Sequence, residues 1–247
     1  MFEIIHMSQL IFGKNPVLEA FTSGQNIEKV YILATLRGET EIKIRNLCKD
    51  HNIPLAKVPE IKLDDLTKKK NHQGLVAMLS PVTYHTMEKV MADVVDKKGF
   101  MVILDNVTDV RNIGGIARSA YFFGASALVL SGNFSGQINE DTVKTSAGAI
   151  LQIPICRTGS LLSVMADLQN KGIMTYATDV KGKLLPYEAD YKHPTAIIMG
   201  AEEKGLHYKV LESADETIKI EGNGSFDSLN VGVATGILLY EISRQRR

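Results

Sequence analysis

The chain has 247 residues, of which 45% are hydrophobic and 23% charged, a composition typical of a globular protein that can bury a substantial core. Its 28 Lys and Arg residues balance its 28 Asp and Glu residues, so overall charge indicates no nucleic-acid partner, and a polyanionic ligand would have to be held by local patches. No apolar run reaches the roughly 18 residues that span a membrane, and the N-terminus does not resemble a signal peptide. We therefore expect a cytoplasmic protein without membrane contact.

The cysteines and histidines indicate neither a disulfide nor a metal centre. Cys48 and Cys156 lack Cys-x-x-Cys spacing and have no histidine at metal-ligand spacing, which predicts reduced, buried thiols. The six histidines are scattered, without a pair at the helical spacing that binds metals. The sequence therefore predicts no metal site.

The first region, residues 9–82, alternates short helical and extended stretches. A helix over 39–51 is indicated by Ile42, Ile44, Leu47 and Cys48, with charged residues between them. The other expected elements of this region are a helix over 15–22 and strands over 30–33, 56–58 and 75–79. Residues 83–98, which follow Pro81, are expected to form a linker that leads into a helix over 87–97.

From residue 99 to 247, strands alternate with helices, which predicts an α/β domain with a parallel sheet covered on both faces. The continuous apolar run at 100–104 is typical of such a buried parallel strand. A helix is expected over 112–123, with Asn112 as its N-cap and Gly124 ending it. Further strands are expected over 127–130, 153–155, 174–177, 195–199 and 217–220, and helices over 141–149, 160–170, 206–213 and 229–245.

Two loops at the carboxyl ends of these strands, where ligands gather in parallel α/β folds, have unusual compositions. The first, 105–115, carries paired glycines and runs into the helix of Arg118. The second, 199–206, ends a buried strand on Gly200, which would let an adenine or ribose lie against the main chain. Either loop could equally be a strand-to-helix turn with a charged surface.

A third loop, 218–230, opens the last predicted helix. Asp227 and Ser228 fit a helix cap, whereas Asn230 is a poor helix former and is expected to have another task. The helical period places four apolar residues on one face, which predicts that they pack into the core. These residues are Leu229, Val233, Ile237 and Tyr240.

Common nucleotide and hydrolase motifs are missing from the sequence. It contains no G-x-G-x-x-G after a strand, no G-x-x-x-x-G-K-[ST] and no G-x-S-x-G. This disfavours a Rossmann dehydrogenase, a P-loop NTPase and an α/β hydrolase. Residue spacing alone predicts only an α/β ligand-binding domain with an unusual site.

Taken in order, the three loops resemble the motifs of the SpoU/TrmH family of RNA 2′-O-methyltransferases, in the SPOUT superfamily. The first motif, N-x-G-x-x-x-R, is similar to 112–118, the second to 199–206, and the third begins with Ser-Leu-Asn-Val at 228–231. Outside the loops, 11–20 and 71–77 are similar to the small ribosomal-protein-like substrate-binding domain of many members. The chain is most like the branch that methylates a guanosine in 23S ribosomal RNA.

The resemblance implies a fold, a cofactor and partners. The fold is a parallel α/β sheet with a trefoil knot, preceded by the substrate-binding domain. S-adenosylmethionine (SAM) is expected in the knot, and the protein is expected to be a homodimer through this domain and to bind RNA, either ribosomal or transfer RNA. The residues expected around the cofactor are Thr178, Gly200, Ile220, Leu229 and Asn230.

The resemblance also implies roles in catalysis. Arg118 would contact the ribose hydroxyl, either as a base or as a charged clamp on the neighbouring phosphate. Asn112 would orient Arg118 or the ribose, and Glu202 would hold the site by hydrogen bonds. Ser228 and Asn230 would shape the cofactor and phosphate pocket. Lys14, Asn15 and the Lys68–Lys70 run are the expected RNA contacts of the first domain.

Three positions depart from the family pattern. Val110 and Glu221 stand where proline is usual, which is expected to alter loop rigidity only. Gly232 stands where serine is common and removes a hydroxyl. Together with the neutral net charge, Gly232 supports an alternative, a non-catalytic RNA-binding protein of the same fold. A methyltransferase that acts on a base is a further alternative.

Overall fold

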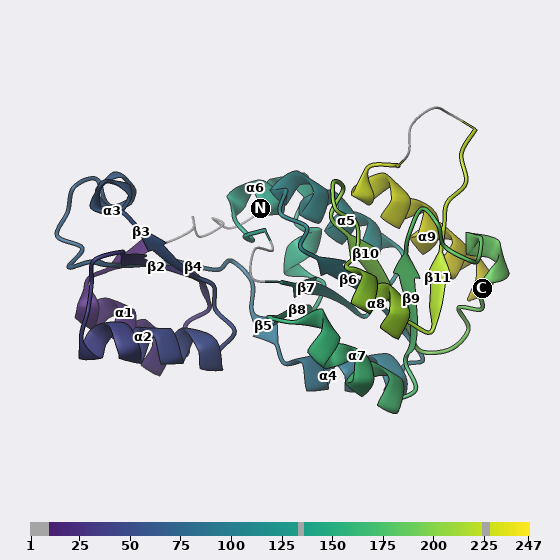
Figure 1. Ribbon diagram of the computed structural model, residues 1–247, viewed down its shortest axis with the longest axis horizontal. Coiled ribbons are helices and arrows are strands. Elements are labelled where there is room, and N and C mark those ends of the chain that lie inside the picture. Colours follow the sequence, from purple (N-terminus) through teal and green to yellow (C-terminus); the bar gives the residue numbers. More distant parts are fainter. Residues whose placement is uncertain (1–9, 133–135, 224–227) are drawn as a thin grey trace, which may run out of the picture. The chain divides into compact units, whose positions relative to one another are not determined.

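The computed structural model describes residues 10–132, 136–223 and 228–247 and divides the chain into two compact units. Unit 1 comprises Met1–Thr83 with Gln137–Glu140, and unit 2 comprises Tyr84–Gly136 with Asp141–Arg247. Figure 1 shows residues 10–83 of unit 1 in purple and blue, and the sheet of unit 2 from β5 in blue to β11 in yellow-green.

Unit 1 contains a mixed sheet with the strand order β1-β4-β2-β3, in which β2 and β3 are parallel and the other pairs antiparallel. Helices α1 and α2 supply Val17, Ala20 and Ile44 to a core shared with Val30 and Ile32 of β2. The elements of unit 1 are β1 (Leu10–Phe12), α1 (Lys14–Thr22), β2 (Ile27–Leu33), α2 (Glu39–Asp50), β3 (Leu55–Val58), α3 (Glu60–Thr67) and β4 (Leu75–Leu79).

The described part of unit 2 contains a seven-stranded sheet in the order β11-β9-β10-β6-β7-β8-β5, and every neighbouring pair is parallel. All residues of β6 are buried, as the apolar run predicts. This confirms the expected parallel α/β class. The strands are β5 (Tyr84–His85), β6 (Phe100–Asp105), β7 (Ala127–Ser131), β8 (Ile155–Thr158), β9 (Met174–Thr178), β10 (Thr195–Gly200) and β11 (Glu216–Ile218).

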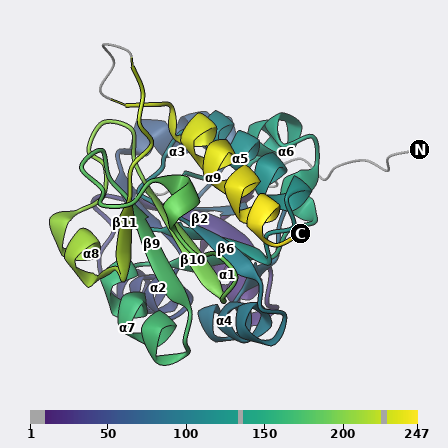
Figure 2. The same ribbon diagram turned by 90° about the vertical axis from the view of Figure 1, so that its right-hand side faces the viewer.

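Helices cover both faces of this sheet. On one face, α4 (Met87–Asp96), α7 (Leu161–Asn170) and α8 (Tyr208–Ser213) share a core with the strands. On the other, α5 (Val110–Phe122) packs along α9 (Val231–Gln245), as Figure 2 shows. The remaining elements are α6 (Glu140–Thr145) and the 3₁₀ turns η1 (Ala149–Leu151) and η2 (Pro186–Glu188). None of the helices in the described ranges is long and apolar enough to cross a membrane.

Two predicted helix starts are wrong because a different side chain caps the helix. Helix α5 begins at Val110, and its N-cap is Asp109, whose carboxylate accepts a hydrogen bond of 2.7 Å from the Arg111 backbone. Asn112 therefore lies inside the first turn. Helix α9 begins at Val231 after the cap Asn230, so Ser228 is not its cap. Asp227 lies outside the described residues.

The predicted helix over 141–149 is interrupted. Helix α6 ends at Thr145, and Ala147 (φ 50°) and Gly148 (φ 83°) turn the chain through left-handed conformations before η1. The short elements β1, α3 and β5 were not predicted, since two to eight residues carry too little periodicity to be recognised.

The apolar face assigned to α9 from its period is the exposed one. Val233, Ile237 and Tyr240 are 53%, 39% and 59% exposed, and Leu229 before the helix is 46% exposed. The prediction that these residues pack into the core is wrong for this chain. The buried residues of α9 are Val231, Thr235, Leu238, Leu239, Glu241 and Ile242. Helix α9 is thus apolar on two sides, and only its partner α5 and the sheet decide which side is covered.

The end of α9 is anchored to the sheet by Arg246. Its guanidinium donates hydrogen bonds to the backbone carbonyls of Lys98, Gly99 (3.2 Å) and His193 (2.6 Å) and lies over the Phe100 ring, 5.3 Å from the centroid. Arg246 therefore has a structural role in unit 2.

Replacing Arg246 with Ala should lower the free energy of unfolding by on the order of 2–3 kcal/mol, because several partly buried carbonyls lose a charged donor. Urea denaturation would measure the change. The control is Arg247→Ala, an exposed neighbour whose loss should change stability by less than about 0.5 kcal/mol. Equal effects of the two variants would contradict the anchoring role.

Candidate functional site

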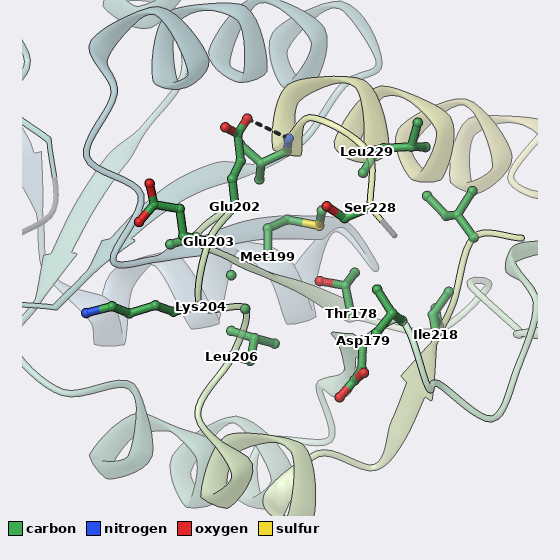
Figure 3. A pocket seen from close by; sticks show the side chains of 17 residues that line it. Thr178, Asp179, Met199, Glu202, Glu203, Lys204, Leu206, Ile218, Ser228 and Leu229 are labelled. Atoms are coloured by element: carbon green, nitrogen blue, oxygen red, sulfur yellow. Dashed lines mark hydrogen bonds between the residues drawn. The ribbon is translucent and has the colours of Figure 1, made fainter. Parts of the chain in front are cut away.

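A cavity of about 360 Å³ lies in unit 2 where β9, β10 and β11 end and α9 begins. Its apolar wall is formed by Met199, Leu206 and Ile218, and its rim carries Asp179 and Glu202 (Figure 3). Mostly apolar walls with a few polar groups are typical of small-molecule sites of this size. Of the residues expected around a cofactor, the cavity is lined by Thr178, Gly200, Ile220 and Leu229, together with Ser228.

One wall of the cavity is a tight loop that folds back on the end of β10. The Gly205 amide donates to the Ala201 carbonyl at 2.8 Å, and Gly205 has a φ of 61°. A Cβ added to Gly200 would lie 2.4 Å from the Gly205 carbonyl carbon and 2.6 Å from the Leu206 amide nitrogen. Position 200 therefore requires glycine because of this loop itself, in addition to any ligand.

Beside Ile218, which lines the cavity, the segment after β9 crosses β11. Amides of Lys183 and Leu184 both donate to the Thr217 carbonyl at 3.0 Å, and the Lys219 amide donates to the Leu184 carbonyl at 2.9 Å. A Cβ at Gly182 would lie 2.4 Å from the Ile218 carbonyl carbon. Sequence reasoning missed Gly182, because nothing around it shows that two main chains meet there.

A hydrogen-bonded cluster of Asn112, Glu202 and Asn230 borders the cavity. The Glu202 Oε1 accepts from the Asn112 side-chain amide (3.2 Å), from the Asn230 side-chain amide and from the Val231 backbone (3.2 Å). The Asn230 amide also donates to the Asn112 Oδ1 at 3.0 Å. The cluster thus joins α5, the loop after β10 and the start of α9, and the bond to the α9 backbone is drawn in Figure 3.

Asn230 has a second task, as its poor helix propensity suggests. Its Oδ1 accepts from the Gly232 (2.9 Å) and Val233 (3.2 Å) backbone amides and so caps α9. A Cβ at Gly232 would lie 3.1 Å from this Oδ1, so position 232 borders the cluster directly. One side chain therefore starts the helix and closes the polar cluster.

Arg118 lies on the exposed side of α5 and has no hydrogen bond or ion pair within the part of the chain that the structure describes. Asn112 binds Glu202 and Asn230 and does not contact Arg118. The guanidinium is therefore available to a ligand, and the structure does not assign Asn112 the task of orienting it.

Lys14 and Asn15 belong to unit 1, where they form the first turn of α1. The Lys14 backbone amide donates to the Gln73 Oε1 at 3.0 Å, which brings the segments 11–20 and 71–77 together. The Lys68–Lys70 run follows α3 as an exposed turn, with Lys68 and Lys69 at φ 54° and 59°.

The thiols of Cys48 and Cys156 are buried, and burial raises their pKa values to about 12 and about 11. Both are therefore protonated near neutral pH. Among the described residues, no group of three or more His, Cys, Asp or Glu side chains is placed to hold a metal ion.

The fold and the cavity define an α/β protein that binds a small cofactor in the loops at the carboxyl ends of its parallel strands. The chain belongs to the SpoU rRNA methylase family, whose pattern matches residues 99–240. A second pattern, described as RNA 2′-O ribose methyltransferase substrate binding, matches residues 10–85. The SpoU/TrmH resemblance of the sequence is thereby confirmed.

Known relatives cover almost the whole chain. An uncharacterized tRNA/rRNA methyltransferase of Mycolicibacterium paratuberculosis is 33% identical over 242 residues, which are 97% of this chain and 78% of the relative. The SpoU methyltransferase AviRb from Streptomyces viridochromogenes, solved with the cofactor AdoMet, is 25% identical with a TM-score of 0.61, over 97% of this chain and 90% of that one.

Two further solved structures are informative. An AdoMet-bound rRNA methyltransferase from Sinorhizobium meliloti is 26% identical with a TM-score of 0.60, over 96% of this chain and 87% of that one. A solved structure described as giving insights into the 2-OH methylation of C/U34 on tRNA is 25% identical to this chain, with a TM-score of 0.55. The match covers 60% of this chain and 97% of that one.

The protein is therefore a SAM-dependent RNA methyltransferase. The cavity fits this cofactor in volume, and its apolar wall next to a glycine-lined main chain suits a flat adenine ring.

Substitution of Gly200 by Ala should weaken SAM binding by about tenfold or more, a loss of about 1.4 kcal/mol, because the new Cβ displaces the 201–206 loop that lines the cavity. Isothermal titration calorimetry would measure the affinity. Gly222→Ala is the matched control, since a Cβ at that position meets no atom within 4 Å. An unchanged affinity in Gly200→Ala would show that the loop does not shape the cofactor site.

Proposed function

We propose that the protein transfers a methyl group from SAM to the ribose 2′-hydroxyl of a nucleotide in structured RNA, with a guanosine in 23S ribosomal RNA as the leading target. Arg118 carries this proposal, because it is unpaired among the described residues and shares α5 with Asn112, a member of the Asn112–Glu202–Asn230 cluster that borders the cavity. Transfer RNA is the second candidate, favoured by the likeness to the tRNA 2-OH methylation structure.

SAM supplies an electrophilic methyl group, so the protein has mainly to align the hydroxyl and help it lose its proton. Arg118 is a reluctant base, because a guanidinium has a pKa above about 12. We assign it instead to the phosphate beside the target ribose, where its charge stabilises the negative charge that develops on the oxygen.

The cluster acts by positioning. Glu202 holds Asn112 on α5 against Asn230 at the start of α9, so the two helices keep a constant spacing at the cavity. We place SAM against Thr178, Gly200, Ile220, Leu229 and Asn230, and Ser228 at the rim. The Thr178 hydroxyl already donates to the Ile198 carbonyl at 3.0 Å, which fixes its rotamer at the cavity wall.

We assign residues 9–82 to RNA binding, 83–98 to the connection and 99–247 to methyl transfer. In unit 1, exposed Lys14 and Asn15 beside Gln73 are the proposed RNA contacts. We also propose the trefoil knot. It is supported by the crossing of residues 182–185 over β11 and by the positions of α8 and α9 on opposite faces of the sheet.

Labelled SAM should transfer its methyl group to ribosomal or transfer RNA that lacks natural methylation, and Arg118→Ala should reduce the rate by about 100-fold or more. Arg118→Lys should recover part of the rate, since it keeps a charge for the phosphate. Label must appear in 2′-O-methylated, nuclease-resistant dinucleotides. If SAM binds and no RNA takes up label, the non-catalytic alternative holds, and label on a base would indicate the other alternative.

We further propose that the protein is a homodimer through an apolar patch on α5 and α9, formed by Phe122, Phe123, Val233, Ile237 and Tyr240. Phe122 is 80% exposed, and the Phe123 ring meets Phe122 and Tyr240 edge-on at centroid distances of 5.0 and 6.4 Å. An exposed patch of large apolar side chains is typical of a protein–protein interface. A second copy of the chain offers the same patch, which suits a twofold contact.

In light scattering coupled to gel filtration, the wild type should be a dimer and Phe122→Glu a monomer, because the substitution buries a charge in the interface. Ile61→Glu is the control, since Ile61 is 69% exposed but belongs to unit 1. A monomeric wild type, or a dimeric Phe122→Glu, would refute the patch as the interface.

A further inference from the structure

The exposed side of α5 carries a stripe of Arg111, Gly115 and Arg118. The two arginines are seven residues apart, so they point the same way and their Cα atoms are separated by roughly 10 Å along the helix axis. Both are exposed, and within the described residues neither side chain has a hydrogen bond or an ion pair. Gly115 lies between them on the same side.

Gly115 is not explained by packing. A Cβ added there would meet no atom within 4 Å, and a glycine inside a helix costs roughly 0.5–1 kcal/mol relative to alanine. Its neighbour Gly114 is different, because a Cβ at that position would lie 2.7 Å from the Thr145 Cβ. The fold therefore requires Gly114, whereas Gly115 keeps a half-buried main chain without a side chain between two cations.

The same Gly114 contact brings a third cation to this helix. Thr145 packs on Gly114, and Lys144 precedes it in the last turn of α6. Lys144 is exposed and has no ion pair among the described residues. The carboxylates closest in sequence are Asp109, which caps α5, and Glu140 and Asp141, which begin α6. Arg111, Arg118 and Lys144 form no ion pair with these carboxylates in the described ranges, so all three charges are available to a ligand.

We propose that Arg111, Gly115, Arg118 and Lys144 form a cradle for the RNA sugar–phosphate backbone next to the target nucleotide. This inference rests on the proposed function and adds to it the binding residues Arg111, Gly115 and Lys144. The cations bind successive phosphates, as in other sites that grip nucleic acid without reading its sequence. The bare main chain at Gly115 allows a ribose to approach α5 more closely than any side chain would permit.

Gly115→Ala tests the cradle with a variant that should be more stable than the wild type, so a loss of RNA affinity cannot be due to unfolding. The variant should melt about 1–3 °C higher than the wild type, because alanine favours the helix and meets no obstacle. Its affinity for a fluorescein-labelled RNA hairpin should nevertheless fall about fivefold or more, with SAM affinity unchanged. A more stable variant that binds the hairpin as tightly as the wild type would overturn the role of Gly115.

Lys144→Gln and Arg111→Gln test the charges through salt dependence. Each should reduce the slope of log Kd against log salt for the same hairpin by roughly 0.7–0.9, the contribution of one phosphate contact. Arg111→Lys should retain the slope. Lys171→Gln, at the end of α7 on the opposite face of the sheet, should leave the slope unchanged.

Two outcomes overturn the cradle. One is that Lys144→Gln and Arg111→Gln give the same slope as Lys171→Gln. The other is that the affinity of the wild type for the hairpin does not depend on salt concentration. The binding assay needs no methyl transfer. An enzyme that binds through the cradle but transfers no methyl group would therefore refute the proposed function and not this surface.

Discussion

The carboxylate of Glu202 holds together the part of the molecule on which the site depends. One of its oxygens receives hydrogen bonds from Asn112, from Asn230 and from the Val231 backbone. These groups come from α5 and α9, which are far apart in the chain and pack on the same face of the sheet. Because all three donors point at one oxygen, each of them is held in place. Glu202 therefore fixes the starts of α5 and α9 beside the cavity.

Close contact between main chains supplies the second constraint. Gly200 and Gly182 each lie where a Cβ would fall within 2.4 Å of another backbone carbon. The first approach shapes the 201–206 loop that lines the cavity, and the second holds the main chain at Ile218, which also lines it, so peptide groups as well as side chains determine the shape of the cavity. A cavity with such walls is largely formed before the cofactor arrives, which lowers the entropic cost of binding.

A chain with no net charge can bind RNA because some of its arginines have partners within the chain and others do not. Arg244 and Arg246 are engaged within unit 2, by Glu241 and by backbone carbonyls respectively. Arg111 and Arg118 have no such partners among the described residues and lie on one side of α5. The same helix ends in the exposed Phe122, so α5 presents a basic surface in its first turns and an apolar one in its last.

The sequence by itself determined the parallel α/β class, the family and the loops that meet at the cavity, because apolar runs and short motifs are local properties. It also singled out Asn230 as a residue with a task beyond the helix. Only the tertiary structure decided that Asp109 and Asn230 cap the helices, and that Asn112 binds Glu202 rather than Arg118. It also decided that Val233 and Tyr240 face outward. Helix α9 is apolar on two sides, and periodicity reports that a side is apolar without reporting what covers it.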